Sequence, residues 1–133
     1  MKKTYLVFVL FLTLVFTVGV QMQTANAESV YVVGEFSGKY FYDDGSSARF
    51  EGNLRQQGAM IWGECIDQDG SESTIAGAVD GNTLNFIKTY NSDNHRVQYT
   101  GNLIPETNTV KGHWRIDQNN IGTFTMTIRG NRM

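Results

Sequence analysis

The chain of 133 residues contains a single cysteine, Cys65, and no block of lysine or arginine residues. One cysteine cannot form a disulfide within the chain, so the fold depends on its core and its hydrogen-bond ladder. Nucleic-acid binding needs a clustered positive face for the phosphates, whereas the formal charge here is −2 at pH 7. We therefore expect no nucleic-acid partner.

The first 27 residues have the three parts of a cleavable signal peptide. Two lysines open the chain, an apolar run extends over residues 5–20, and the small-x-small motif Ala25-Asn26-Ala27 follows. The apolar run is shorter than the about 20 residues that a membrane-spanning helix needs. No cysteine follows Ala27 to carry a lipid. We expect residues 1–27 to be removed, which leaves a secreted or periplasmic domain of residues 28–133 without a membrane anchor.

A five-residue pattern recurs six times in the mature chain. Each copy has an apolar residue, any residue, glycine, any residue and a second apolar residue, and the copies are centred on Gly38, Gly52, Gly63, Gly77, Gly101 and Gly112. Two further segments, 84–88 and 124–128, alternate without the glycine. Alternation with a period of two places one set of side chains on each face of a strand. Each segment therefore predicts a half-buried strand.

Connections rich in Asp, Asn, Gly and Ser separate these segments, and no segment has a helical period. They are too short for crossover helices, so consecutive strands should pair antiparallel. A flat meander would expose two edges, and closing the sheet removes both. We predict an all-β fold, a single antiparallel up-and-down β-barrel of about eight strands. The inward glycines either let the strands coil tightly or leave a cavity beside the large side chains.

The length, the succession of strands and the early Gly38-Lys39-Tyr40 resemble the calycin-like barrels, which include the avidins and lipocalins. A Gly-x-Trp near the first strand is typical of those families, and here Gly112-His113-Trp114 has it only near the end. The resemblance is architectural. From lipocalins it implies a small apolar ligand, and from avidins it implies biotin, but the biotin-binding positions have no match in this chain.

Lys88 shares the phase of Leu84 and Phe86, so alternation points its ammonium group into the barrel. A lone buried charge is costly, and a ligand anion would neutralise it. Alternatively, Lys88 lies at the rim and reaches water, or a bulge changes the phase. The candidate ligand-binding residues are Tyr40, Phe86, Lys88, Tyr99 and Trp114, although the aromatic ones are equally good core residues.

Met60 and Trp62 fall on the opposite phase, which places them on the outer face. Exposed Met and Trp side chains can mark a surface for a protein partner. Ordinary surface scatter, or cover by the apolar N-terminal segment 30–33, explains them as well.

Reactive groups are few. The segment Asp67–Glu72 has part of a calcium-loop pattern but lacks its spacing and flanking helices, so it is interpreted as a hairpin turn. His95 and His113 have no metal-ligand spacing with Cys65, which is interpreted as a small buried hydrophobe. No Gly-x-Ser-x-Gly elbow occurs. We predict no catalytic residue, metal or cofactor.

The leading hypothesis is an exported, soluble, non-enzymatic protein that binds a small molecule in the barrel or at its mouth. The alternative is a secreted interaction or inhibitor module that uses its hairpin loops and the face of Met60 and Trp62. An enzyme with a site built from loops ranks third. The sequence predicts neither the ligand nor the oligomeric state.

Overall fold

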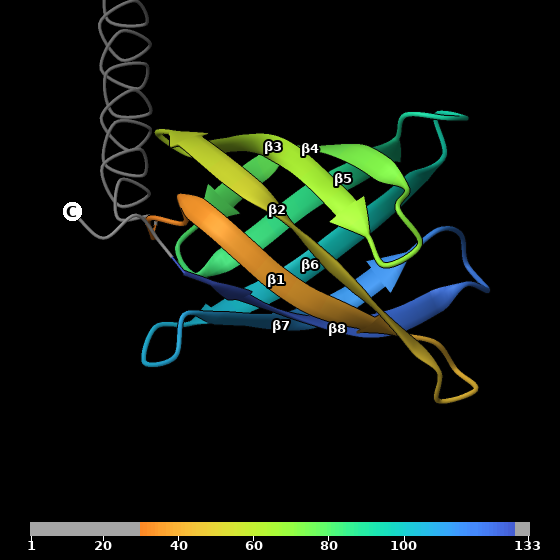
Figure 1. Cartoon of the computed structure of the whole chain (residues 1–133). Coiled ribbons are helices and arrows are strands. Elements are labelled where there is room, and N and C mark those ends of the chain that lie inside the picture. The colour runs from red at the N-terminus through yellow and green to blue at the C-terminus, as the bar shows by residue number, and fades with distance from the viewer. Residues whose placement is uncertain (1–29, 130–133) are drawn as a thin grey trace, which may run out of the picture.

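The computed structural model describes residues 30–129, which form a closed barrel of eight strands (Figure 1). Each strand pairs antiparallel with its neighbours in sequence, and β1 pairs with β8 to complete the ring. The strands are β1 (Gly34–Phe41), β2 (Ser47–Gln57), β3 (Met60–Asp67), β4 (Glu72–Asp80), β5 (Thr83–Tyr90), β6 (Arg96–Ile104), β7 (Thr109–Arg115) and β8 (Ile121–Ile128). The predicted fold class is confirmed.

The described part of the chain contains no helix long and apolar enough to cross a membrane. The predicted signal peptide, residues 1–27, lies outside the described residues, so its cleavage stays a prediction.

The inward glycines allow neighbouring strands to approach closely. A Cβ atom at Gly63 would collide with the carbonyl oxygen of Asn53, and one at Gly112 would collide with that of Thr100. Aromatic rings add to this crowding; a Cβ at Gly38, for example, would lie 2.2 Å from the carbonyl oxygen of Thr125 and 2.8 Å from the ring of Phe50. Of the two outcomes left open by the sequence, the structure shows tight coiling around a filled interior.

Aromatic rings fill the middle of the barrel. The rings of Phe86 and Tyr99 stack with centroids 5.0 Å apart, and Phe124 meets Tyr99 edge-on at 5.0 Å. Aliphatic side chains such as Leu54 and Val110 are buried toward the end where the chain enters. An eight-stranded barrel is just wide enough to be filled in this way.

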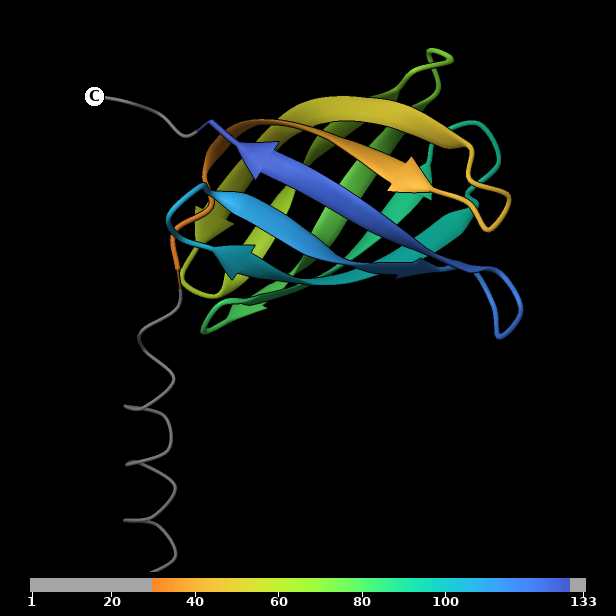
Figure 2. The ribbon, with the colours of Figure 1, turned by 90° about the horizontal axis from the view of Figure 1, so that it is seen from below.

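The two ends of the barrel differ. The segment before β1 crosses one end, where Val32 is buried and its backbone N–H donates to the Gln56 side chain at 2.8 Å. Val30 donates to the carbonyl of Gly81 in the β4–β5 hairpin. Three of the seven hairpins lie at this end, and the other four, β1–β2, β3–β4, β5–β6 and β7–β8, gather at the opposite end (Figures 1 and 2). The N-terminal segment therefore covers one end, and the opposite end is the mouth.

Candidate ligand-binding site

The mouth contains a pocket of about 260 Å³. All four hairpins of this end contribute to its wall. Five of the lining residues are aromatic rings with a polar group, namely Tyr40, Tyr42, Tyr90, Tyr99 and Trp114, and the remaining wall includes His95 and Asp69. Such rings combine a large apolar surface with a hydrogen-bonding tip, which suits them to hold an organic molecule.

A buried ion pair forms the floor beneath these rings. The Lys88 ammonium lies 2.5 Å from Oδ1 of Asp67, and the two residues are 1% and 5% exposed. The Tyr90 and Tyr40 hydroxyls both donate to Oδ2 of Asp67, at 2.5 Å and 3.0 Å. Both carboxylate oxygens therefore have partners.

Strand alternation and register bring this pair together. Asp67 continues the inward phase of Ile61 and Cys65 on β3, and Lys88 lies inward on β5. Strand β4 separates the two, and its inward residue at this level is the small Ser73, which pairs in register with Cys65 and Tyr90. The small side chain leaves room for the long Lys88 stem to reach the carboxylate.

Aromatic rings surround the Lys88 ammonium as well. It lies 5.0 Å from the centroid of Tyr90, 5.2 Å from those of Tyr40 and Phe50, and 5.8 Å from that of Tyr99. Distances below about 6 Å allow a favourable cation–π attraction. The charge of Lys88 is thus balanced within the barrel.

Three buried phenols of the pocket, those of Tyr40, Tyr90 and Tyr99, stay protonated. Burial and the neighbouring Asp67 charge raise the pKa of Tyr40 and of Tyr99 above the ordinary value of 10, and burial and the hydrogen bond to Asp67 raise the pKa of Tyr90. Burial raises the pKa of the Cys65 thiol to about 11. At neutral pH these three tyrosines present neutral hydroxyls, and the thiol is not a ready nucleophile.

The rim of the pocket is acidic. The hairpin loops at residues 42–46, 68–71, 91–95 and 116–120 contain five aspartates and no lysine or arginine. Backbone hydrogen bonds from Ser71 and Asn119 hold the pKa of Asp69 and Asp117 below the ordinary value of 3.8. These carboxylates cap their own turns and remain ionised at neutral pH.

The predicted ligand-binding residues occupy two levels. Tyr40, Tyr99 and Trp114 line the mouth pocket. Phe86 lies deeper, stacked on Tyr99 and 3% exposed. Lys88 faces inward as alternation indicated, but its counterion is Asp67 and not a ligand anion. Whether any of these residues contacts a ligand stays a prediction.

Asp67 is the residue that sequence reasoning missed. The sequence pattern assigns Asp67 to a hairpin turn, and the turn does begin there, because the Asp67 carbonyl accepts a hydrogen bond from Gly70 N–H at 2.9 Å. Its position two residues after Cys65 on the inward phase was the available signal. The inward phase extended by two residues beyond Cys65 places a carboxylate on the same inner face as Lys88.

Met60 and Trp62 lie on the outer face, as their phase predicted. Met60 is 65% exposed, whereas Trp62 is partly buried between its register partners Arg55 and Ala76. The N-terminal segment buries Val32 in the core. A role of this face in partner binding stays a prediction.

Over residues 30–129, no three His, Cys, Asp or Glu side chains are placed to hold a metal ion together. Asp67 points into the barrel and Asp69 caps the backbone of Ser71, so neither is directed at a common cation.

No family model and no curated protein matches this chain. Solved structures do match. One is a redesigned β-barrel, with 17% identity and a TM-score of 0.59 over 75% of this chain and 92% of that one. Another is a de novo designed fluorescence-activating β-barrel, with 14% identity and a TM-score of 0.58 over 77% of this chain and 98% of that one. A third is the protein EF1p2_mFAP2b bound to DFHBI, with 16% identity and a TM-score of 0.57 over 74% of this chain and 94% of that one. At these identities the likeness shows the fold, an eight-stranded up-and-down barrel, without assigning it to the calycins.

Proposed function

We propose that the mature chain is an exported, soluble, non-enzymatic protein that binds a small molecule at the mouth of its barrel. The observation that carries the proposal is the aromatic pocket of about 260 Å³ above the paired Asp67 and Lys88. A binding protein needs a preformed concave site with a few oriented polar groups. The hydrogen bonds of Tyr40 and Tyr90 to Asp67 preorganise two of its walls.

The size and charge of the pocket favour a small planar ligand that is neutral or cationic. A dry cavity of about 150 Å³ can hold benzene, so the mouth has room for roughly one or two fused rings. Lys88 is neutralised by Asp67, so the floor offers no free cation to an anion. The ionised aspartates of the rim favour a cation, and the pocket-lining rings of Tyr42, which is 44% exposed, and Trp114 supply faces on which it can stack.

The solved barrel bound to DFHBI supports the proposal at the level of the fold, since a barrel of this shape carries a small-molecule ligand there. Export rests on the signal-peptide pattern of residues 1–27. The absence of a nucleophile elbow in the sequence and the raised pKa of the Cys65 thiol support a non-enzymatic role.

Two measurements test the proposal. Native mass spectrometry of the protein from its host's exported fraction should show an extra mass that disappears on denaturation. A calorimetric titration then compares three ring systems of similar size, 1-methylquinolinium, quinoline and 1-naphthoate. We expect the cation to bind more tightly than the anion because of the acidic rim.

Tyr42→Ala is the informative variant, because Tyr42 lines the pocket and is 44% exposed. Tyr31→Ala is its matched control, since Tyr31 is 76% exposed and precedes β1, at the covered end. Binding should weaken in the first variant and persist in the second. No co-purifying mass together with no binding of any of the three compounds, or equal binding by both variants, would reject the mouth as the site.

The alternative function, a protein-interaction module, is favoured by one feature of the outer wall. On β3, Met60 pairs with Ala78 of β4, and Trp62 pairs with Ala76 of the same strand. Ala76 pairs on its other side with Ile87 of β5, which is 40% exposed. Three neighbouring strands thus share an apolar strip. Trp62→Ala should abolish a partner interaction through this strip while leaving mouth binding unchanged.

A further inference from the structure

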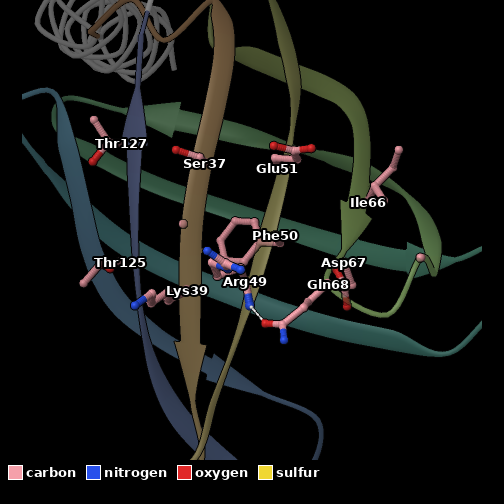
Figure 3. A pocket seen from close by; sticks show the side chains of 12 residues that line it. Ser37, Lys39, Arg49, Phe50, Glu51, Ile66, Asp67, Gln68, Thr125 and Thr127 are labelled. Carbon is pink, nitrogen blue, oxygen red and sulfur yellow. Dashed lines mark hydrogen bonds between the residues drawn. The ribbon is translucent and has the colours of Figure 1, made fainter.

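A second hollow lies on the outer wall of the barrel, and it borders the mouth pocket at the β3–β4 hairpin, where Asp67 lines both. It is a groove of about 750 Å³ that crosses the outer faces of β8, β1 and β2 and ends at the β3–β4 hairpin (Figure 3). Its polar lining gathers at two ends. Lys39 and Arg49 lie together at one end, and Ser37 and Glu51 lie toward the other (Figure 3).

Lys39 and Arg49 are direct register partners on β1 and β2. Both side chains are exposed on the same outer face. Residues directly opposite each other in an antiparallel pair have Cβ atoms about 5 Å apart, and like charges there repel. On the other side of Lys39, its partner on β8 is Thr125, and the partner of Thr125 on β7 is Lys111. One row of four strands therefore presents three cations and a hydroxyl.

No carboxylate of the described residues forms an ion pair with these cations. The two ion pairs found over residues 30–129 join Arg55 to Glu64 and Lys88 to Asp67. Glu51 is the acidic side chain exposed in the groove, and its register partners are Ser37 and Ile66. Lys39 and Arg49 thus face each other without a salt bridge to any carboxylate of the described residues.

The loop beside Arg49 is held in place. The Gln68 side chain accepts a hydrogen bond from the Arg49 backbone N–H at 3.1 Å, and Gln68 N–H donates to the Arg49 carbonyl at 2.8 Å. These bonds fix the backbone from which the guanidinium extends. Thr125 is partly buried at the opposite edge of the groove, with a hydroxyl that can donate.

We propose that this groove binds a tetrahedral oxyanion, a phosphate or sulfate group, between Lys39 and Arg49, with the Thr125 hydroxyl as a third donor. A guanidinium can donate two parallel hydrogen bonds to such a group, and an ammonium adds a mobile point charge. The bound anion would also relieve the repulsion between the two cations. The three donors lie on the outer wall and not among the residues that line the mouth pocket, so the site does not require the proposed function.

An NMR titration of the purified protein tests the site, with inorganic phosphate added at constant ionic strength. We expect saturable shifts at the amides of Lys39, Arg49, Gln68 and Thr125. Loss of one charge-assisted hydrogen bond weakens binding by about tenfold or more, so Lys39→Gln and Arg49→Gln should each reduce the affinity by that factor. Arg55→Gln is the matched control, because Arg55 lies on the outer face of the same strand and is paired with Glu64.

Thermal unfolding gives a second readout. Without phosphate, Lys39→Gln should unfold at the same temperature as the parent protein or a higher one, because the like-charge contact is gone. With phosphate, the parent should gain more stability than the variant at the same phosphate concentration, because the variant binds more weakly. Shifts that do not saturate or that spread over the barrel, or equal weakening by Arg55→Gln, would overturn the proposal.

Glucose 6-phosphate distinguishes the sources of the oxyanion. Tighter binding of this monoester than of inorganic phosphate would show that the group is carried on an organic molecule that also contacts the groove. Equal affinities would show that the free ion is the ligand. Both outcomes support the oxyanion site, and neither depends on the mouth pocket.

Discussion

The buried pair of Asp67 and Lys88 gives the sharpest prediction about stability. Lys88→Met keeps most of the side-chain volume and removes the ammonium group, which leaves the Asp67 carboxylate at 5% exposure without its cation. Breaking a buried ion pair by removing one partner costs about 3–5 kcal/mol. The Tyr40 and Tyr90 hydroxyls still donate to the carboxylate, so we expect a value near the lower end, about 3 kcal/mol.

Urea unfolding of the parent and the variant, followed by circular dichroism, measures this difference. A domain of about 100 residues unfolds with a total free energy of only about 5–15 kcal/mol, so the loss is a large fraction of it. In the double variant Lys88→Met with Asp67→Asn, both charges are absent and the amide oxygen can still accept from a tyrosine. Replacing both members of a buried pair is often close to neutral, so the double variant should recover most of the stability.

Arg55→Met is the exposed counterpart. Arg55 and Glu64 form an ion pair with side chains 50% and 59% exposed, and such surface pairs contribute about 0–1 kcal/mol. Equal losses in Lys88→Met and Arg55→Met would refute the reasoning, because burial would then make no difference. A double variant less stable than Lys88→Met would refute the assignment of Asp67 as the counterion.

Three further predictions concern the same interior. Cys65 is 1% exposed with a thiol pKa of about 11, so the native protein should react with a maleimide at neutral pH far more slowly than the unfolded protein in urea, as followed by mass spectrometry. The folded state raises the pKa of Tyr40 and Tyr90, so it favours their protonated forms. Above about pH 10 the unfolded chain loses these protons and the folded chain does not, so the free energy of unfolding should fall as the pH rises. The double variant Tyr40→Phe with Tyr90→Phe should show a shallower fall. An unchanged dependence of the unfolding free energy on pH would contradict the raised pKa values. Gly63→Ala should destabilise the protein by about 1–3 kcal/mol or more, because the new Cβ meets a backbone carbonyl, whereas a Ser37→Ala change on the outer face should cost less than about 0.5 kcal/mol in the same urea assay.

The sequence was sufficient to predict the barrel because its signals are local and repeated. Alternation around glycines such as Gly52 and Gly101 marks strand after strand, and the turn clusters fix the order of pairing. The position of Lys88 on the inner face followed from the same alternation. These features depend on neighbours within a few residues, which is the range over which periodicity is informative.

The floor of the pocket and the outer groove depend on register, which periodicity does not give. Asp67 and Lys88 are 21 residues apart in the chain, and their meeting requires the pairing of β4 with both β3 and β5. Lys39 and Arg49 face the same side only because β1 and β2 pair with these residues opposite each other. The absence of a basic block in the sequence therefore did not exclude a local cluster of cations on the folded surface.

The internal ion pair also limits how far a ligand can enter. Lys88 already places a cation among the rings of Tyr40, Tyr90 and Tyr99, next to the Asp67 carboxylate. A second cation at that depth would meet the repulsion of the ammonium group, so a cationic ligand must remain above it, among Tyr42, Trp114 and the rim aspartates. If Asp67 and Lys88 serve only as the floor, the neutral double variant should retain binding of 1-methylquinolinium at the mouth. If the ion pair orients Tyr40 and Tyr90 for the ligand, the same variant should be stable and bind more weakly, and comparing its unfolding with its titration separates the two roles.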